Sequence, residues 1–275
     1  AYEKRIAEYE EAAKQFEGDT PTIAMRGGVS RARQDNPELA SMVAAVDDSV
    51  GAITGKLEEL GLDDNTVVIF FSDNGGYGPA TDMEPLKGYK GTYYEGGIRE
   101  PLFVKWPGVI QAGTKSAEPV IGVDLYPTLC EIAGAPLPDE QIVDGRSLLP
   151  ILRGEQDTFG ERALFWHFPA YLQSYRVWDE QRDSLFRSRP CSVIRVGDLK
   201  LHQFFEDGGL ELYQLRDDIG ESNDLSATNP EKLKQLLTQL ENWRQRVAAP
   251  VPTERNPEYD AAAESRALKR MSKNR

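Results

Sequence analysis

Cysteine and histidine are scarce in this sequence, which contains two residues of each type. Cys130 and Cys191 are too few for a disulfide framework or a zinc cluster, so one bridge or, more simply, two unrelated buried thiols are expected. No stretch approaches the roughly 18 consecutive apolar residues of a membrane helix, so no membrane span is predicted. The 275 residues are enough for one large domain, or for a large domain and a smaller one.

Basic residues are also in the minority, because 32 lysines and arginines stand against 45 acidic residues and the formal net charge is −13. Binding to nucleic acid or to an anionic membrane needs a basic face, so neither partner is expected. An anionic substrate would require a local group of positive charges. The C-terminal residues 261–275 are locally basic, and we expect a disordered tail there, with an interaction arm as the alternative.

The sequence begins at Ala1 without an initiator methionine and without the apolar segment of a signal peptide. These features predict that the chain is either processed or a fragment. They leave its compartment open.

The first 160 residues predict helices that alternate with strands. An N-cap followed by proline, Asn36-Pro37, starts the clearest helix. The unbroken β-branched and aromatic run at 66–71 predicts a strand buried on both faces, as in a parallel sheet. Periodicity and turn residues together predict helices at 3–17, 36–60 and 124–133, a further strand at 101–106, and loops at 18–35, 72–98 and 135–160.

The character of the sequence changes after about residue 155. Short apolar runs separated by tight turns predict an antiparallel meander, followed by an amphipathic helix that starts at Asn229-Pro230 and covers one face. The predicted strands are 163–168, 192–196, 199–205 and 210–215. The predicted fold class is therefore α/β, followed by a smaller α+β subdomain.

Asp73 and Asn74 directly follow the predicted buried strand, in the segment Ser72-Asp73-Asn74-Gly75-Gly76. Ligands of open α/β sheets bind beyond the carboxyl ends of strands. A carboxylate beside a carboxamide supplies the hard oxygen donors that Ca²⁺ or Mg²⁺ prefers. A turn that closes the strand without any metal is the alternative.

Positive charge is concentrated in the segment from Lys87 to Arg99, which also contains Lys90 and several glycines. Glycines let the backbone approach a ligand closely, and lysines can bind a tetrahedral anion as point charges. The alternative is a flexible surface loop whose lysines are solvated.

Taken together, these motifs resemble the sulfatase family, the arylsulfatase-like enzymes of the alkaline phosphatase superfamily. The resemblance rests on SDNGG, KGYKGTYYEGGIREP, WPG, DLYPTL with a following AGA, and DGRSLLP, in this order over residues 36–155. It implies that 1–155 form the C-terminal part of an alkaline-phosphatase-like α/β/α sandwich. Residues 156–260 would then be the C-terminal subdomain, an antiparallel sheet with a C-terminal helix.

The resemblance also implies roles for individual residues. Asp73 and Asn74 match the second pair of ligands to one divalent metal, usually Ca²⁺, with Mg²⁺ as the alternative. Lys90 matches the catalytic lysine that binds the sulfate group and stabilises charge near the leaving oxygen. Glu95 and Arg99 match residues that order this loop behind the site. Lys87 is a further candidate for substrate binding.

The sequence departs from the family pattern in one respect. The family's nucleophile is a formylglycine made from the Cys or Ser of a Cys/Ser-x-Pro-x-Arg motif. This motif does not occur anywhere in the 275 residues. We therefore expect the formylglycine upstream, in a missing N-terminal portion of the same enzyme that acts as the chain's partner. The isolated chain is then expected to be inactive.

The two histidines lie in the predicted meander. His167 is a candidate for the rim of a substrate pocket, with a half-buried strand residue and a local hydrogen bond as the favoured alternative. His202 alternates with its neighbours in a hairpin and is expected at the surface. The aromatic residues Tyr171, Tyr175 and Trp178 predict either a carbohydrate-binding rim or local packing.

The preferred function is hydrolysis of a sulfate ester, possibly on a sulfated carbohydrate. A phosphatase or phosphodiesterase of the same superfamily is the first alternative, although such relatives usually use histidine ligands. A non-catalytic module that binds anionic glycans or a protein is the second. The family resemblance alone implies export to the periplasm or the extracellular space.

Overall fold

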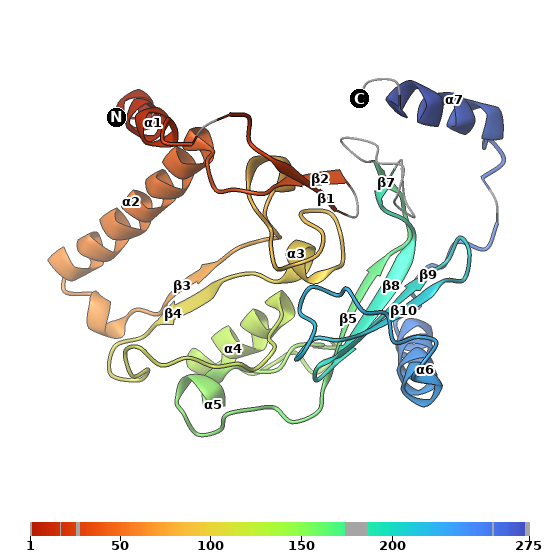
Figure 1. Cartoon of the computed structure of the whole chain (residues 1–275). Coiled ribbons are helices and arrows are strands. Elements are labelled where there is room, and N and C mark those ends of the chain that lie inside the picture. The colour runs from red at the N-terminus through yellow and green to blue at the C-terminus, as the bar shows by residue number, and fades with distance from the viewer. Residues whose placement is uncertain (1, 17, 26–27, 174–185, 255, 273–275) are drawn as a thin grey trace. The chain divides into compact units, whose positions relative to one another are not determined.

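The computed structural model describes the whole chain except residues 1, 17, 26–27, 174–185, 255 and 273–275 (Figure 1). It contains two compact units, each made of segments that are separated in the sequence. Unit 1 comprises Ala1–Ser49, Ser72–Pro101 and Phe165–Arg275, and unit 2 comprises Val50–Phe71 and Leu102–Leu164. Segments of the two units alternate along the chain, whereas the sequence analysis divides the chain once, between residues 155 and 156. That domain boundary stays a prediction.

The N-terminal helices α1 (Tyr2–Ala13) and α2 (Pro37–Glu59) lie close to their predicted positions. The Asn36 Oδ1 accepts a hydrogen bond from the Leu39 N–H at 3.1 Å, which confirms the predicted N-cap. Gly61 follows the helix with a φ of 64°, a conformation typical of a residue after a helix end. Several apolar residues of α2 are exposed, namely Met42, Val43, Val46 and Ile53.

The loop expected at 18–35 is wrong in part, because this region contains the hairpin of β1 (Thr22–Met25) and β2 (Gly28–Arg31). The strands are antiparallel, with Ile23 opposite Ser30. Their four-residue length and polar residues produce no clear alternation of apolar side chains. The Ser30 hydroxyl, fully buried, donates to the Thr81 carbonyl at 2.9 Å, so contacts distant in sequence help to hold the hairpin.

A four-stranded sheet in unit 1 confirms the predicted meander. Its strand order is β10 (Leu210–Gln214), β9 (Leu199–Phe204), β8 (Cys191–Val196) and β5 (Ala163–Phe168), and β8, β9 and β10 pair in antiparallel fashion. Helix α6 (Pro230–Arg246) packs against β8 and β9 and buries Leu236 and Leu240, as predicted. Cys191 lies in the core with Phe204 and Tyr213, and no disulfide joins Cys130 to Cys191.

Unit 2 contains β3 (Val68–Phe71), β4 (Leu102–Lys105) and α4 (Leu125–Ile132) at the predicted positions. The expectation of a parallel, doubly buried strand is wrong for β3, because β3 pairs with β4 in antiparallel fashion and is only partly buried. An apolar run favours a strand but does not determine the direction of the strand that pairs with it. Asp124 stabilises this unit, since its buried carboxylate receives hydrogen bonds from the Ile121 N–H, the Arg146 N–H and the Arg162 guanidinium.

The remaining described elements are short. They are η1 (Asp63–Asn65), η2 (Gly78–Ala80), α3 (Glu95–Ile98), η3 (Gly122–Asp124), α5 (Leu149–Leu152), β6 (Leu172–Gln173) and β7 (Phe186–Ser188). No helix within the described ranges is both long enough and apolar enough to cross a membrane.

The expectation of a disordered tail is wrong for residues 261–272, which form helix α7 (Ala261–Ser272). Asp260 accepts a hydrogen bond from the Ala262 N–H at 2.8 Å and therefore closes the first turn. Three consecutive alanines follow, and alanine is the residue with the highest helix propensity. The sequence of the tail therefore combines basic charge with local helix signals.

Candidate functional site

The loop that carries Asp73 and Asn74 follows β3 and is held in unit 1 by two backbone hydrogen bonds. The Ser72 N–H donates to the Pro101 carbonyl at 3.3 Å, and the Gly75 N–H donates to the Gly97 carbonyl at 3.0 Å. Asp73 is exposed and Asn74 is half-buried. The predicted metal ligands therefore lie on a fixed backbone, with the carboxylate open to solvent.

Glycines allow this loop to pack directly on α3 and the segment before it. A Cβ atom on Gly75 would lie 1.9 Å from the Gly96 carbonyl oxygen, and one on Gly96 would lie 2.2 Å from the Gly88 oxygen. A Cβ on Gly97 would lie 2.1 Å from the Thr92 oxygen. Since real Cβ atoms do not approach oxygens so closely, these positions require glycine.

Lys90 is joined to the same loop. Its N–H donates to the Gly76 carbonyl at 2.9 Å, and the residue itself is exposed. The structure thus brings together two motifs that the sequence keeps apart, the Asp73-Asn74 pair and the predicted sulfate-binding lysine. An exposed ammonium and an exposed carboxylate on bonded backbone segments form a polar site that can hold a cation and an anion.

The residues around Asp73 fit a divalent cation. The Oε1 atom of Glu100 is buried, and no hydrogen-bond partner is found for it in the described part of the chain. Burial raises the pKa of Glu100 to about 7, and the nearby Asp73 carboxylate adds to the rise while a hydrogen bond with Ser72 opposes it. Two neighbouring carboxyl groups together with the Asn74 carboxamide are the hard donors that Ca²⁺ or Mg²⁺ prefers.

This ligand set is partial. Among the described residues, no group of three or more histidine, cysteine, aspartate or glutamate side chains is arranged to hold a metal ion. Ca²⁺ takes about 6–8 oxygen ligands, so Asp73 and Asn74 would need donors from elsewhere.

Lys87 and His167 make contacts within the protein. The Lys87 Nζ donates to the Tyr213 hydroxyl at 3.2 Å and to the Glu221 carbonyl at 2.5 Å, and it lies 4.7 Å from the centre of the Tyr94 ring. The His167 Nε2 lies 2.8 Å from the Pro250 carbonyl oxygen. Because a carbonyl only accepts, Nε2 carries the proton, and Nδ1 accepts from the Ser192 hydroxyl at 2.8 Å. These contacts match the local-bond alternative for His167.

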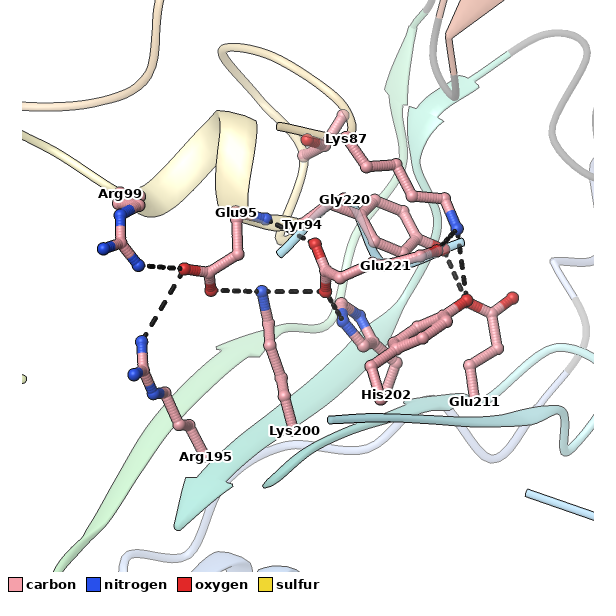
Figure 2. A network of polar contacts seen from close by, with 12 residues as sticks. Lys87, Tyr94, Glu95, Arg99, Arg195, Lys200, His202, Glu211, Gly220 and Glu221 are labelled. Atoms are coloured by element: carbon pink, nitrogen blue, oxygen red, sulfur yellow. Dashed lines mark hydrogen bonds and ion pairs between the residues drawn. The ribbon is translucent and has the colours of Figure 1, made fainter. Parts of the chain in front are cut away.

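Glu95 and Arg99 belong to a network of charged residues that also includes Arg195, Lys200, His202 and Glu221 (Figure 2). The Glu95 carboxylate accepts a hydrogen bond from the Arg99 guanidinium at 3.1 Å and another from the Lys200 ammonium at 3.0 Å. Arg195 lies 3.6 Å from the same carboxylate. Lys200 then bridges from Glu95 to Glu221, with an Nζ to Oε1 distance of 3.1 Å. We call Glu95, Lys200, His202 and Glu221, which are all buried, the buried charge network. The Arg99 and Arg195 side chains, 51% and 15% exposed, contact this network at Glu95.

Glu221 connects this network to the backbone of α3. Its Oε2 accepts a hydrogen bond from the Glu95 N–H at 2.6 Å, and its Oε1 lies 3.1 Å from the His202 Nε2. Glu221 has a φ of 49°, which residues other than glycine rarely adopt. The buried contacts of the side chain offset this backbone strain, and they tie the sheet of unit 1 to the start of α3.

The expectation that His202 lies at the surface is wrong. His202 is 1% exposed, and its ring stacks on Tyr94 with the ring centres 4.6 Å apart. Burial lowers the pKa of His202, although the hydrogen bond with Glu221 opposes this effect. Strand alternation identifies two faces, but a turn from elsewhere in the chain covers the face that carries His202.

The network predicts how stability depends on pH. The folded state keeps His202 neutral, whereas the unfolded chain binds a proton below about pH 6.5, so the free energy of unfolding should fall between pH 7 and 5. We expect His202→Gln, which retains a hydrogen-bonding group, to reduce this slope. Urea denaturation at several pH values measures it, and equal slopes for both proteins would contradict the burial of a neutral His202.

Glu221 affects the stability of the protein in a lower range of pH than His202 does. Burial alone would raise its pKa, but the Lys200 charge and the His202 hydrogen bond lower the pKa to about 2. Its contribution to stability is therefore complete above about pH 4.5 and is lost as the pH falls towards 2.

Comparisons with known proteins identify the family to which the chain belongs. The chain matches the family model for sulfatase at residues 4–135 and the model for N-sulphoglucosamine sulphohydrolase, C-terminal, at residues 89–248. A curated sulfatase of Formosa agariphila is 40% identical over 215 residues, which cover 72% of this chain and 37% of that protein.

Two solved structures are similar at the level of the fold and the sequence. Ps i-CgsB in complex with k-i-k-neocarrahexaose has a TM-score of 0.64 and 26% identity, over 88% of this chain and 48% of that chain. BT4656 in complex with its substrate D-glucosamine-2-N,6-O-disulfate has a TM-score of 0.63 and 27% identity, over 80% and 42% respectively.

The mixed α and β structure, with its antiparallel sheet and C-terminal helix, has the alkaline-phosphatase-like fold. The chain belongs to the sulfatase family, as the motifs around Asp73 and Lys90 predict. It spans about a third of the length of the curated relative, 37%, and less than half of the two solved chains.

Sequence reasoning missed Glu100, Lys200 and Glu221. A weak signal existed for Lys200, since alternation in a strand places it on the same face as His202 and the apolar Phe204, opposite to Leu199 and Leu201. No local signal marks Glu221, which lies in a turn after β10 and reaches its partners only through the tertiary fold.

Proposed function

We propose that this chain is the metal- and sulfate-binding portion of a sulfatase that hydrolyses a sulfate ester. The hydrogen bond between the Lys90 N–H and the Gly76 carbonyl carries the proposal, because it joins the lysine to the Asp73-Asn74 loop. In this proposal residues 1–155 belong to the catalytic domain and residues 156–260 to the C-terminal subdomain.

Lys90 is the proposed catalytic residue of the chain. Its ammonium would bind a sulfate oxygen and stabilise the negative charge that develops on the leaving alcohol oxygen as the sulfur–oxygen bond breaks. Asp73 and Asn74 would hold one divalent cation, Ca²⁺ or alternatively Mg²⁺. When bound, that cation supplies positive charge against the sulfate oxygens. Glu95 and Arg99 would keep the loop in place, and Lys87 and His167 would support the fold.

The nucleophile does not come from these residues. The chain contains no Cys/Ser-x-Pro-x-Arg motif, so it offers no position for a formylglycine. We propose that another segment of the same enzyme supplies that residue and further metal ligands. No catalytic step of the nucleophile is assigned to this chain.

A sulfated carbohydrate is the proposed substrate. One similar structure holds a substrate that is a sulfated glucosamine, and another holds a neocarrahexaose. Tyr171 is exposed and is retained as a candidate for a sugar-binding rim, while Tyr175 and Trp178 lie outside the described residues. Because large sulfated glycans occur outside cells, we also propose that the enzyme is exported.

A sulfatase assay with a complemented enzyme tests the proposal. The chain is produced together with a sulfatase segment that carries a formylglycine, and release of sulfate and of phosphate from matched aryl esters is measured. We expect sulfate release from the combination, none from the chain alone, and a loss of about 100-fold or more in Lys90→Ala. The control is Lys234→Ala, which changes an exposed lysine on α6.

Each other result has a distinct meaning. Sulfate release by the chain alone would contradict the assignment of the nucleophile to another segment. A preference for the phosphate ester would favour a phosphatase, and tight binding of the ester without turnover in the combination would favour a binding module.

A further inference from the structure

Strands β6 and β7 in unit 1 touch the backbone on the carboxyl side of Lys90. The Arg187 guanidinium donates a hydrogen bond from Nη1 to the Lys90 carbonyl at 3.1 Å. The Ser188 hydroxyl, on the next residue of β7, donates to the Gly91 carbonyl at 2.7 Å. Two successive peptide carbonyls of the lysine loop are therefore bound by two successive side chains of one strand.

Gly91 shows how closely this strand pair approaches the loop. Gly91 has a φ of 91°, which favours glycine. A Cβ atom there would lie 2.6 Å from the Leu172 Cδ2 and 3.1 Å from the Arg187 Nη1. Leu172 pairs with Ser188 in the antiparallel β6–β7 ladder, so both strands contribute to the contact.

Both sides of the Lys90 backbone are thus held, but by different parts of unit 1. The N–H is bonded to Gly76 of the Asp73-Asn74 loop, and the carbonyl is bonded to Arg187 of β7. A lysine side chain has four rotatable bonds and is flexible. The region that its ammonium can reach relative to Asp73 is limited by the direction of the Lys90 Cα–Cβ bond, which the two backbone hydrogen bonds hold fixed.

We infer that Arg187 and Ser188 are positioning residues for Lys90, which rests on the sulfate-binding role proposed above. Arg187 determines the orientation of the Lys90 carbonyl, and Ser188 determines that of Gly91. Neither residue transfers a proton or bonds to sulfate in this role. Strand β7 thereby raises the affinity of the site for sulfate, because it holds the backbone of Lys90 in place.

A double-mutant cycle tests this inference, because it separates action through Lys90 from direct contact with the ligand. The probe is D-glucosamine-2-N,6-O-disulfate, and its affinity is measured by calorimetry in the presence of Ca²⁺. The complementing segment carries alanine in place of the formylglycine in this experiment, so that the probe is bound but not hydrolysed. We expect Arg187→Ala to weaken binding about tenfold, as for loss of a hydrogen bond from a charged donor. Arg187→Ala should cause no further loss when Lys90→Ala is already present.

One control variant and one further test variant complete the set. Arg189→Ala removes the same charge from a nearby position, where the guanidinium pairs with Glu206, and should leave the affinity unchanged. Ser188→Ala removes the second contact without a change of charge and should weaken binding less than Arg187→Ala. Thermal unfolding of each variant checks that the protein remains folded.

The outcomes separate this inference from the proposed function. If the wild type fails to bind the probe, or if Lys90→Ala binds it as tightly as the wild type, the sulfate-binding role itself is overturned. If Lys90→Ala loses binding while Arg187→Ala does not, only the positioning role is overturned. A full tenfold additional loss in the double variant would show that Arg187 contacts the ligand independently and would also overturn that role.

Discussion

Lys200→Met should lower the free energy of unfolding by about 3–5 kcal/mol, the usual cost of removing one partner from a buried ion pair. Lys200 is 0% exposed and its ammonium lies 3.0 Å from Glu95 and 3.1 Å from Glu221. Methionine has a similar length but no charge, so both buried carboxylates would lose their shared partner. The loss of charge, rather than a cavity, would then account for the effect.

Urea denaturation of the wild type and the variant measures this change. Lys234→Met, on an exposed position of α6, is the matched control and should change stability by less than about 0.5 kcal/mol. In the double variant Lys200→Met/Glu221→Gln, one uncompensated carboxylate is removed, so the loss should be smaller than the sum of the two single losses. A change below about 1 kcal/mol in Lys200→Met would contradict the importance of this charge.

Gly75→Ala should disrupt the site itself. The new Cβ would lie 1.9 Å from the Gly96 carbonyl oxygen, so the Asp73-Asn74 loop must move away from α3. Overpacking of this kind costs about 1–3 kcal/mol of stability. The larger effect is on turnover of the complemented enzyme, because a displacement of about 1 Å among catalytic groups can cost about 100-fold in rate.

Gly51→Ala is the matched control for this substitution. Gly51 lies within α2, and no atom lies within 4 Å of a Cβ placed there. Alanine should therefore stabilise the helix by up to about 1 kcal/mol and leave turnover unchanged. Equal activities of Gly75→Ala and Gly51→Ala would mean that the contact between the loop and α3 does not determine the geometry of the site.

The elements predicted best are those with strong local signals. Helix α2 combines a cap at Asn36, a proline at its start and a glycine after its end. The meander of β8, β9 and β10 was visible because glycine-containing turns separate its strands. The direction of pairing of β3 was not visible, since Val68–Phe71 has the same composition whether its neighbour runs parallel or antiparallel.

In the candidate site, too, some residues could be predicted from local sequence signals and others could not. Asp73, Asn74 and Lys90 lie in motifs that are contiguous in sequence, so their types and spacing identify them. Lys200 and Glu221 contact Glu95, and Arg187 contacts Lys90, so each pair joins residues that are about 100 or more positions apart in the sequence. The pair of Lys200 and Glu221 is closer in sequence. Single-sequence periodicity carries no information on such pairs, and His202 was misplaced for the same reason.

The most direct measurement of the central claim is the calcium dependence of sulfate-ester binding. The affinity for D-glucosamine-2-N,6-O-disulfate is measured by calorimetry with Ca²⁺ and with a chelator, for the wild type and for Asp73→Ala, each complemented with a segment in which alanine replaces the formylglycine. We expect Ca²⁺ to raise the affinity of the wild type by about tenfold or more and to have little effect on Asp73→Ala. The same affinity with and without Ca²⁺ in the wild type would contradict a joint metal and sulfate site at Asp73, Asn74 and Lys90.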